Sequence, residues 1–323
     1  MTTNPQPELL RGKAHQPHPS DLAAILSAIG GFTCWVFADS IMKMVGRSAL
    51  PAYQVIGFLG LFITGFLVAY TLARRDTSAL WPQRPRRQLV RSSLDLINNL
   101  CVVVALRHVP LTLFYILVFM SPGVITILAA IFIREKPGLR KSLAIAIGFA
   151  GVVIAVNPFT SSRQGDWIGY AACMTCVACF SVNMVWSRIL TQTESPESLT
   201  IFSGVVMAVA GFGSMLWHAE PLTLHLLLAL VSMGAFGATG SICFFVALRH
   251  TTASNVSQYH YTQLVTGAVV SYLLFHELPT VWMFLGGALI VASGLYIAFL
   301  ASRSHNIGQI CETSSCSTLN TGR

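Results

Sequence analysis

The chain has 323 residues, of which 54% are hydrophobic and only 10% are charged, and its formal net charge is +8 at pH 7. Soluble domains are about one-quarter charged, so this composition excludes an ordinary soluble globular protein and indicates apolar surface that faces lipid. The basic residues lie in short loops between apolar runs, which favours a membrane topology signal over a nucleic acid partner.

Ten apolar stretches are long enough to span a bilayer, which takes about 20 residues of helix. They cover approximately residues 22–42, 51–72, 88–106, 111–133, 140–157, 166–188, 198–217, 223–248, 254–275 and 280–301. Polar tails at residues 1–20 and 302–323 flank them, and no cleavable signal peptide is apparent. If the ten spans cross the membrane alternately, most of the 20 Lys and Arg residues lie in loops and tails on the same side of the membrane as the N-terminus. Basic residues are enriched on the cytoplasmic side, so we expect both termini to be cytoplasmic.

An internal repeat divides the chain into two halves. Val-Ala-Leu-Arg-His occurs at residues 104–108 and again at 246–250, an offset of 142, and the same offset aligns Glu135 with Glu277. Each half holds five predicted spans, and an odd number makes the second copy enter the membrane upside down. We therefore predict an all-α integral membrane protein with ten transmembrane helices in two inverted five-helix repeats, residues 21–158 and 163–301. Inverted repeats are typical of transporters, whose sites lie near the midplane where the repeats meet.

Several short motifs recur at matching places in the two halves. The third span of each half ends in Ala-Leu, at residues 105–106 and 247–248, and the fourth closes on Glu and Pro, at residues 135–137 and 277–279. Ser121-Pro122 interrupts the fourth span of the first half, whereas the second half has Gln263-Leu264 there. In these features residues 21–300 resemble the EamA-type family of the drug/metabolite transporter superfamily. The resemblance implies a central cavity and alternating access, but not the substrate, because the family moves amino acids and their derivatives, nucleotide sugars, metallophores and other small metabolites.

Polar side chains at membrane depth are costly, so they are the candidate substrate-binding residues. In the third span Asp95, Asn98 and Asn99 follow i, i+3, i+4 spacing and share one helical face. One interpretation makes this face a wall of the cavity, with Asp95 receiving a proton or an ammonium group. The other pairs Asp95 with Arg91 one turn earlier and bonds the asparagines to neighbouring helices. The sequence leaves both open.

The ninth span is the most polar. Tyr259, Thr262, Gln263 and Thr266 follow i, i+3, i+4 and i+7 spacing, which predicts a continuous stripe along one face. We expect this stripe to line the solute path, with Tyr259 and Gln263 as binding residues, although hydrogen bonds between helices would also explain it. His260 lies off the stripe and is a weaker candidate.

Further candidates come one or two to a span: Trp35 in the first, Tyr115 in the fourth, and Asn183 with Trp186 in the sixth. For Asp39 we expect a simple pair with Lys43, which follows one turn later.

Cysteines and glutamates are assigned structural roles. The run Cys173, Cys176 and Cys179 is expected to serve close helix packing, because zinc sites prefer paired motifs and often use His. Glu135 and Glu277 match between the repeats at helix ends, which indicates pairing across a loop.

These observations predict a secondary transporter of a small polar or amphipathic metabolite, and we expect export of an amino acid or an amino-acid-derived compound. The expected partners are the substrate, the bilayer and protons as a candidate coupling ion; no cofactor, metal or nucleic acid is expected. No phosphate-binding loop is present, so ATP-driven transport is not indicated. The alternatives are an intramembrane enzyme, for which no catalytic constellation is found, and a receptor or structural protein. The resemblance places the chain in a bacterial inner membrane; substrate, direction, coupling ion and oligomeric state stay open.

Overall fold

A computed structural model of the chain describes residues 19–75, 80–121, 123–124, 128, 139–156, 165–250, 256, 259–260 and 262–296. Residues 1–18 and 297–323, which include nearly all of both polar tails, lie outside the described residues, as do Pro122 and Glu135. The described part is helical, with no strand among its residues.

Helices occupy all ten predicted spans. The labelled helices are α1 (Pro19–Gly46), α2 (Ala52–Ala73), α3 (Pro85–His108), α4 (Leu111–Val118), α6 (Leu139–Val156), α7 (Trp167–Leu190), α8 (Pro196–Met215), α9 (Leu224–His250) and α11 (Thr262–Phe275). A last helix covers Val281–Tyr296. Among the described residues, 6 helices are long and apolar enough to cross a membrane, and shorter apolar helices include Thr262–Phe275. Apolar side chains on outward faces stay exposed, for example Val209 at 69% and Leu273 at 64%, as lipid contact requires.

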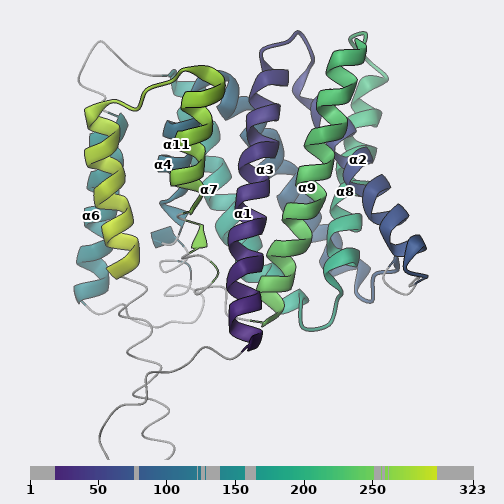
Figure 1. Cartoon of the computed structure of the whole chain (residues 1–323), viewed down its shortest axis with the longest axis horizontal. Helices are drawn as coiled ribbons and strands as arrows, with labels where there is room; N and C mark the ends of the chain where they lie inside the picture. The colour runs from purple at the N-terminus through teal and green to yellow at the C-terminus, as the bar shows by residue number, and fades with distance from the viewer. Residues whose placement is uncertain are drawn as a thin grey trace, which may run out of the picture.

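The two halves interlock across the bundle (Figure 1). Helix α1 packs along α9, α3 along α7, α2 along α8, and α4 along α11. The repeat equates α1 with α7 and α3 with α9, so exchanging the halves converts the α1–α9 contact into the α7–α3 contact. The same exchange maps α2–α8 and α4–α11 onto themselves. The packing thus has the pseudo-two-fold relation that an inverted repeat predicts, and the predicted fold class is confirmed.

Small residues bring the helices at this pseudo-axis into backbone contact. A Cβ atom on Gly60 of α2 would lie 2.4 Å from the carbonyl oxygen of Gly204 of α8. On the other flank, a Cβ on Gly286 would lie 2.3 Å from the carbonyl oxygen of Gly151. Close approach of this kind is how membrane helices gain packing energy when lipid offers no hydrophobic drive.

The start of α7 is fixed by its N-cap. The carboxylate of Asp166 accepts a hydrogen bond from the backbone N–H of Gly169 at 2.9 Å, which satisfies an otherwise free donor of the first turn. This backbone bond, together with the neighbouring His108 ring, holds the pKa of Asp166 below its usual value. Nδ1 of His108 lies 2.8 Å from the same carboxylate, so the end of α3 is tied to the beginning of α7.

Candidate functional site

A cavity of about 130 Å³ lies between the two halves. Helices α1, α2, α3 and α4 of the first half and α7, α8, α9 and α11 of the second contribute side chains to it. Seven of the nine predicted site residues line it: Trp35, Asp95, Asn98, Asn99, Tyr115, Asn183 and Gln263. Polar side chains from distant parts of the sequence therefore meet at the interface of the repeats.

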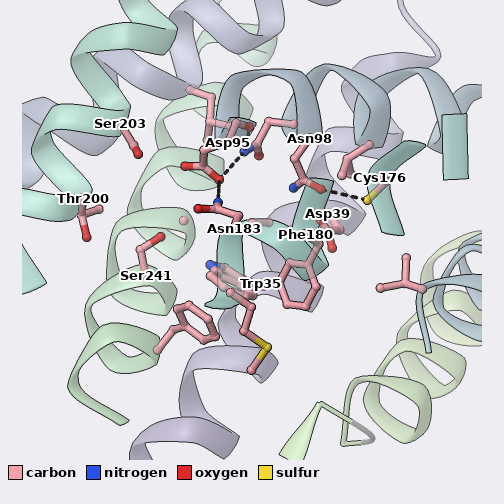
Figure 2. A pocket seen from close by; sticks show the side chains of 18 of the residues that line it. Trp35, Asp39, Asp95, Asn98, Cys176, Phe180, Asn183, Thr200, Ser203 and Ser241 are labelled. Atoms are coloured by element: carbon pink, nitrogen blue, oxygen red, sulfur yellow. Dashed lines mark hydrogen bonds between the residues drawn. The ribbon is translucent and has the colours of Figure 1, made fainter. Parts of the chain in front are cut away.

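One wall joins α3 to α7 through amide and carboxylate groups (Figure 2). Nδ2 of Asn99 and Nδ2 of Asn183 each donate to Oδ1 of Asp95 over 3.4 Å, and Sγ of Cys176 donates to Oδ1 of Asn98 over 3.1 Å. The face predicted from the i, i+3, i+4 spacing is thus turned toward the cavity. The two bonds to Asp95 are longer than ordinary hydrogen bonds, so its carboxylate keeps most of its accepting capacity.

Arg91 also lines the cavity, and it does not pair with Asp95. Its side chain is 1% exposed, and no ion pair involves it among the described residues. Instead Nη2 donates to the carbonyl oxygen of Leu199 at 2.8 Å and to the hydroxyl of Ser203. The ion pair that the alternative interpretation expects between Asp95 and Arg91 is therefore not formed among the described residues, whereas the bond between Asn98 and Cys176 of α7 is the contact with a neighbouring helix that it also expects. Sequence reasoning did not treat Arg91 as a site residue.

Asp39 does not pair with Lys43, contrary to expectation. The hydroxyl of Tyr115 donates to Oδ2 of Asp39 at 2.9 Å, which turns this carboxylate into the cavity. Lys43 has another partner because α11 ends next to α1, with Nζ 2.7 Å from Oε1 of Glu277. Local i, i+4 spacing could not reveal a carboxylate supplied by the other repeat.

Aromatic rings also line the cavity. The ring centroids of Trp35 and Phe244 lie 4.9 Å apart, and those of Phe180 and His260 lie 5.0 Å apart in a stacked arrangement. Nε2 of Gln263 donates to the carbonyl oxygen of Phe32 at 3.1 Å and so fixes the start of α11 against α1. The cavity thus presents flat aromatic surfaces as well as carboxylates and amides (Figure 2).

Two predicted site residues, Tyr259 and Trp186, do not line the cavity. Tyr259 packs against a hydrophobic cluster, and His260 lines the cavity in its place. Regular helix α11 begins only at Thr262. The i, i+3, i+4 spacing that was used to place Tyr259 on the same face as Gln263 therefore does not apply. Trp186 is 36% exposed, and its Nε1 donates to the carbonyl oxygen of Arg87 at 3.3 Å, so its ring lies against the start of α3 outside the cavity.

Both ends of the bundle carry ties between the repeats. At the end where α1 and α11 finish and α4 begins, Glu277 accepts from Lys43, from Ser271 at 2.9 Å and from the backbone N–H of Leu111 at 3.3 Å. At the other end Glu194 accepts from the backbone N–H groups of Gln83 at 3.0 Å and Arg84 at 2.7 Å. The repeats are therefore joined above and below the cavity.

The family follows from comparison with known proteins. The model of the EamA-like transporter family matches residues 22–157 and 167–299, one match to each half. The chain belongs to the EamA-like transporter family. Family membership and its relatives make this EamA protein a multi-pass membrane transporter of a small molecule and not an enzyme.

Curated relatives of this EamA protein carry different solutes. It is 28% identical to the riboflavin transporter of Rhizobium johnstonii, with 79% of this chain and 82% of the relative aligned. It is 25% identical to the pseudopaline exporter CntI of Pseudomonas aeruginosa, with 80% and 90% aligned. It is 21% identical to the S-adenosylmethionine uptake transporter of Rickettsia bellii, with 81% and 89% aligned. A solved crystal structure at 17% identity has a TM-score of 0.63 and covers 86% of this chain and 98% of its own, which shows the shared fold.

Proposed function

We propose that this protein is a secondary transporter that exports a small amphipathic metabolite, an amino acid or an amino-acid-derived compound, by alternating access. The observation that carries the proposal is the cavity between the two halves, which is lined both by carboxylates and amides and by aromatic rings. Relatives named for S-adenosylmethionine and riboflavin support it, because both solutes combine a flat ring system with polar groups.

The size of the cavity supports a moving carrier over a permanently open pore. Its volume of about 130 Å³ is below the roughly 300–1,000 Å³ of ordinary small-molecule sites. A solute therefore needs the repeats to separate at one end, and the ties through Glu277 and Glu194 are the contacts that would break in turn. Rocking of one repeat against the other about the α2–α8 contact provides that motion.

The proposed setting is a bacterial inner membrane, which the bacterial relatives support. The excess of Lys and Arg on one side of the predicted spans supports both termini in the cytoplasm. Coupling to protons would use a carboxylate that faces the cavity, and Asp39 and Asp95 are the two such groups among the described lining residues. Substrate binding is assigned to the seven predicted residues that line the cavity.

The test combines metabolite profiling with reconstitution. Cells that lack the protein should retain a metabolite that cells expressing it release, and purified protein in proteoliposomes should move that compound. Asn183→Leu, which removes an amide from the cavity wall, should slow the flux, whereas Val209→Leu on the lipid-facing surface should not. Folded protein that moves none of the differing metabolites in either direction would contradict the proposal.

A further inference from the structure

Arg91 is a buried cation with unused hydrogen-bonding capacity. Its guanidinium carbon lies 5.0 Å from the centre of the Phe245 ring, and Nη2 makes its two hydrogen bonds to α8. Nε is buried without a partner, and no carboxylate among the described residues forms an ion pair with it. A guanidinium has five N–H donors, so most of them make no hydrogen bond to the described residues.

A structural role does not explain the charge at this position. One turn earlier on α3, the neutral side chain of Gln88 makes the same kind of link to α8, with Nε2 donating to Ser198 at 3.1 Å. A neutral amide is thus sufficient to tie these helices together. Burying an arginine that makes no direct ion pair costs far more free energy than burying an amide. The excess cost is offset if an anionic group of the solute binds there.

Asp95 lies one turn further along the same face of α3. Residues at i and i+4 have Cβ atoms about 5–6 Å apart, and both side chains line the cavity. Oδ1 of Asp95 accepts only the two bonds of 3.4 Å, and Oδ2 accepts none among the described residues. The helix therefore presents a cation and an anion side by side, not paired with each other.

We propose that Arg91 and Asp95 together bind the zwitterionic headgroup of an α-amino acid, a proposal that rests on the transport function above. The free N–H groups of Arg91 receive the carboxylate, and Asp95 receives the ammonium group. The remainder of the solute lies against Trp35 and Phe180, which face Asp95 across the cavity (Figure 2).

The balance of charge favours a carboxylate over a phosphate. The described lining residues include one arginine and two aspartates, Asp39 and Asp95, and no lysine. A phosphate carrying about two negative charges would be repelled by both carboxylates. A carboxylate accompanied by its own ammonium group adds no net charge and satisfies both ends of the Arg91–Asp95 pair.

Matched ligand sets test the proposal on the full chain purified in detergent. The probes are L-phenylalanine and L-methionine, each with its carboxamide, its decarboxylated amine and its deaminated acid, and binding is measured by calorimetry. Wild-type protein should bind at least one zwitterion about tenfold or more tightly than either its amide or its deaminated acid, since each loses a charge-assisted contact. Absence of such a preference for both amino acids overturns the proposal, whatever other solute the protein transports.

Variants separate recognition from stability. Arg91→Met should remove the preference for the amino acid over its carboxamide. Asp95→Asn should remove the preference for the amino acid over its deaminated acid. Arg91→Lys keeps the charge and should keep part of the preference. Arg188→Met is the control, because Arg188 also donates to a carbonyl oxygen of another helix, that of Leu248 at 2.5 Å, but does not line the cavity.

A purely structural arginine gives a different pattern. Arg91→Met would then weaken binding of the amino acid and of its carboxamide by the same factor, and this result would overturn the proposal. If Arg91→Met does not fold, Arg91→Lys is compared with wild type instead. Carboxylate binding is refuted if Arg91→Lys binds the amino acid and its carboxamide more weakly by the same factor, so that the ratio of the two affinities is unchanged. Flux of a solute without a headgroup of this kind would leave the transport function standing and refute only the role of Arg91 and Asp95.

Discussion

The ion pair between Lys43 and Glu277 should control how often one end of the cavity opens. Both carboxylate oxygens of Glu277 lie within 2.8 Å of Nζ of Lys43, and the lysine side chain is only 4% exposed. When the repeats separate at this end, both groups become hydrated and lose the contact. Lys43→Met therefore destabilises the closed end and leaves the open end almost unchanged.

The size of the effect follows from burial. Removing one partner of a buried ion pair costs about 3–5 kcal/mol. The cost here should be nearer about 2 kcal/mol, because Glu277 is 23% exposed and Arg47 lies 3.6 Å from it as a partial replacement. Since 1.4 kcal/mol is a factor of ten in an equilibrium constant, the ratio of open to closed ends should rise about 30-fold.

Spin labels measure this ratio directly. Labels at Ala49 and Leu278, which are both exposed at this end, can be placed in a background without the 8 native cysteines. In liposomes, Lys43→Met should shift the distance distribution toward the longer separation. Arg47→Met should shift it little, because a pair with a 60% exposed partner contributes about 0–1 kcal/mol. An unchanged distribution in Lys43→Met would refute the reasoning that this pair holds the end closed.

Three further changes test other parts of the structure. Gly60→Ala should lower the melting temperature strongly, because the added Cβ would lie 2.4 Å from a backbone atom of α8. Gly65→Ala is the control and should not lower it, because nothing lies within 4 Å of its added Cβ. Equal melting temperatures for the two variants would argue against tight α2–α8 packing. Gln263→Leu should weaken substrate affinity in a flux assay while Tyr259→Phe leaves it intact, since only the first residue lines the cavity, and the reverse result would contradict that placement. The Asp166 carboxylate has a lowered pKa in the folded protein, so its stabilising effect is present above the unfolded pKa of about 3.9 and fades as the pH falls through the folded value. The difference in melting temperature between wild type and Asp166→Ala should therefore shrink below about pH 4, and a difference that stays constant would count against this cap.

The architecture was accessible from the sequence because duplication leaves a direct trace. The repeated Val-Ala-Leu-Arg-His and the count of spans predict the inverted halves, and the helix pairing in the structure follows that relation. The polar face of α3 was also predictable, since Asp95, Asn98 and Asn99 lie within one regular helix where spacing determines the face. The exact bounds of the repeats and tails stay predictions.

Contacts between the repeats could not be predicted in this way. Lys43 and Glu277 are separated by 234 residues, and the nearest carboxylate in the sequence, Asp39, is held by Tyr115 instead. Arg91 was overlooked because its partners are a carbonyl group and a hydroxyl on α8, which leave no pattern in the sequence. A buried arginine that forms no ion pair with the carboxylate one turn away is a signal that only the packed structure provides.

All the charged side chains that line the described cavity, Asp39, Arg91 and Asp95, belong to the first repeat. Among the described lining residues, the second repeat contributes hydroxyls, amides, one thiol and rings. Two inverted repeats with identical linings would give outward-open and inward-open states of equal energy, because a two-fold rotation would convert the solute contacts of one state into those of the other. In the proposed mechanism the charged end of the solute travels with the first repeat while the second moves past it, so the two states would hold the solute with unequal affinity. A carrier without an energy source cannot turn this inequality into net transport, because a matching bias between the empty states offsets it. The unequal affinity does decide on which side of the membrane the protein binds its solute at the lower solute concentration.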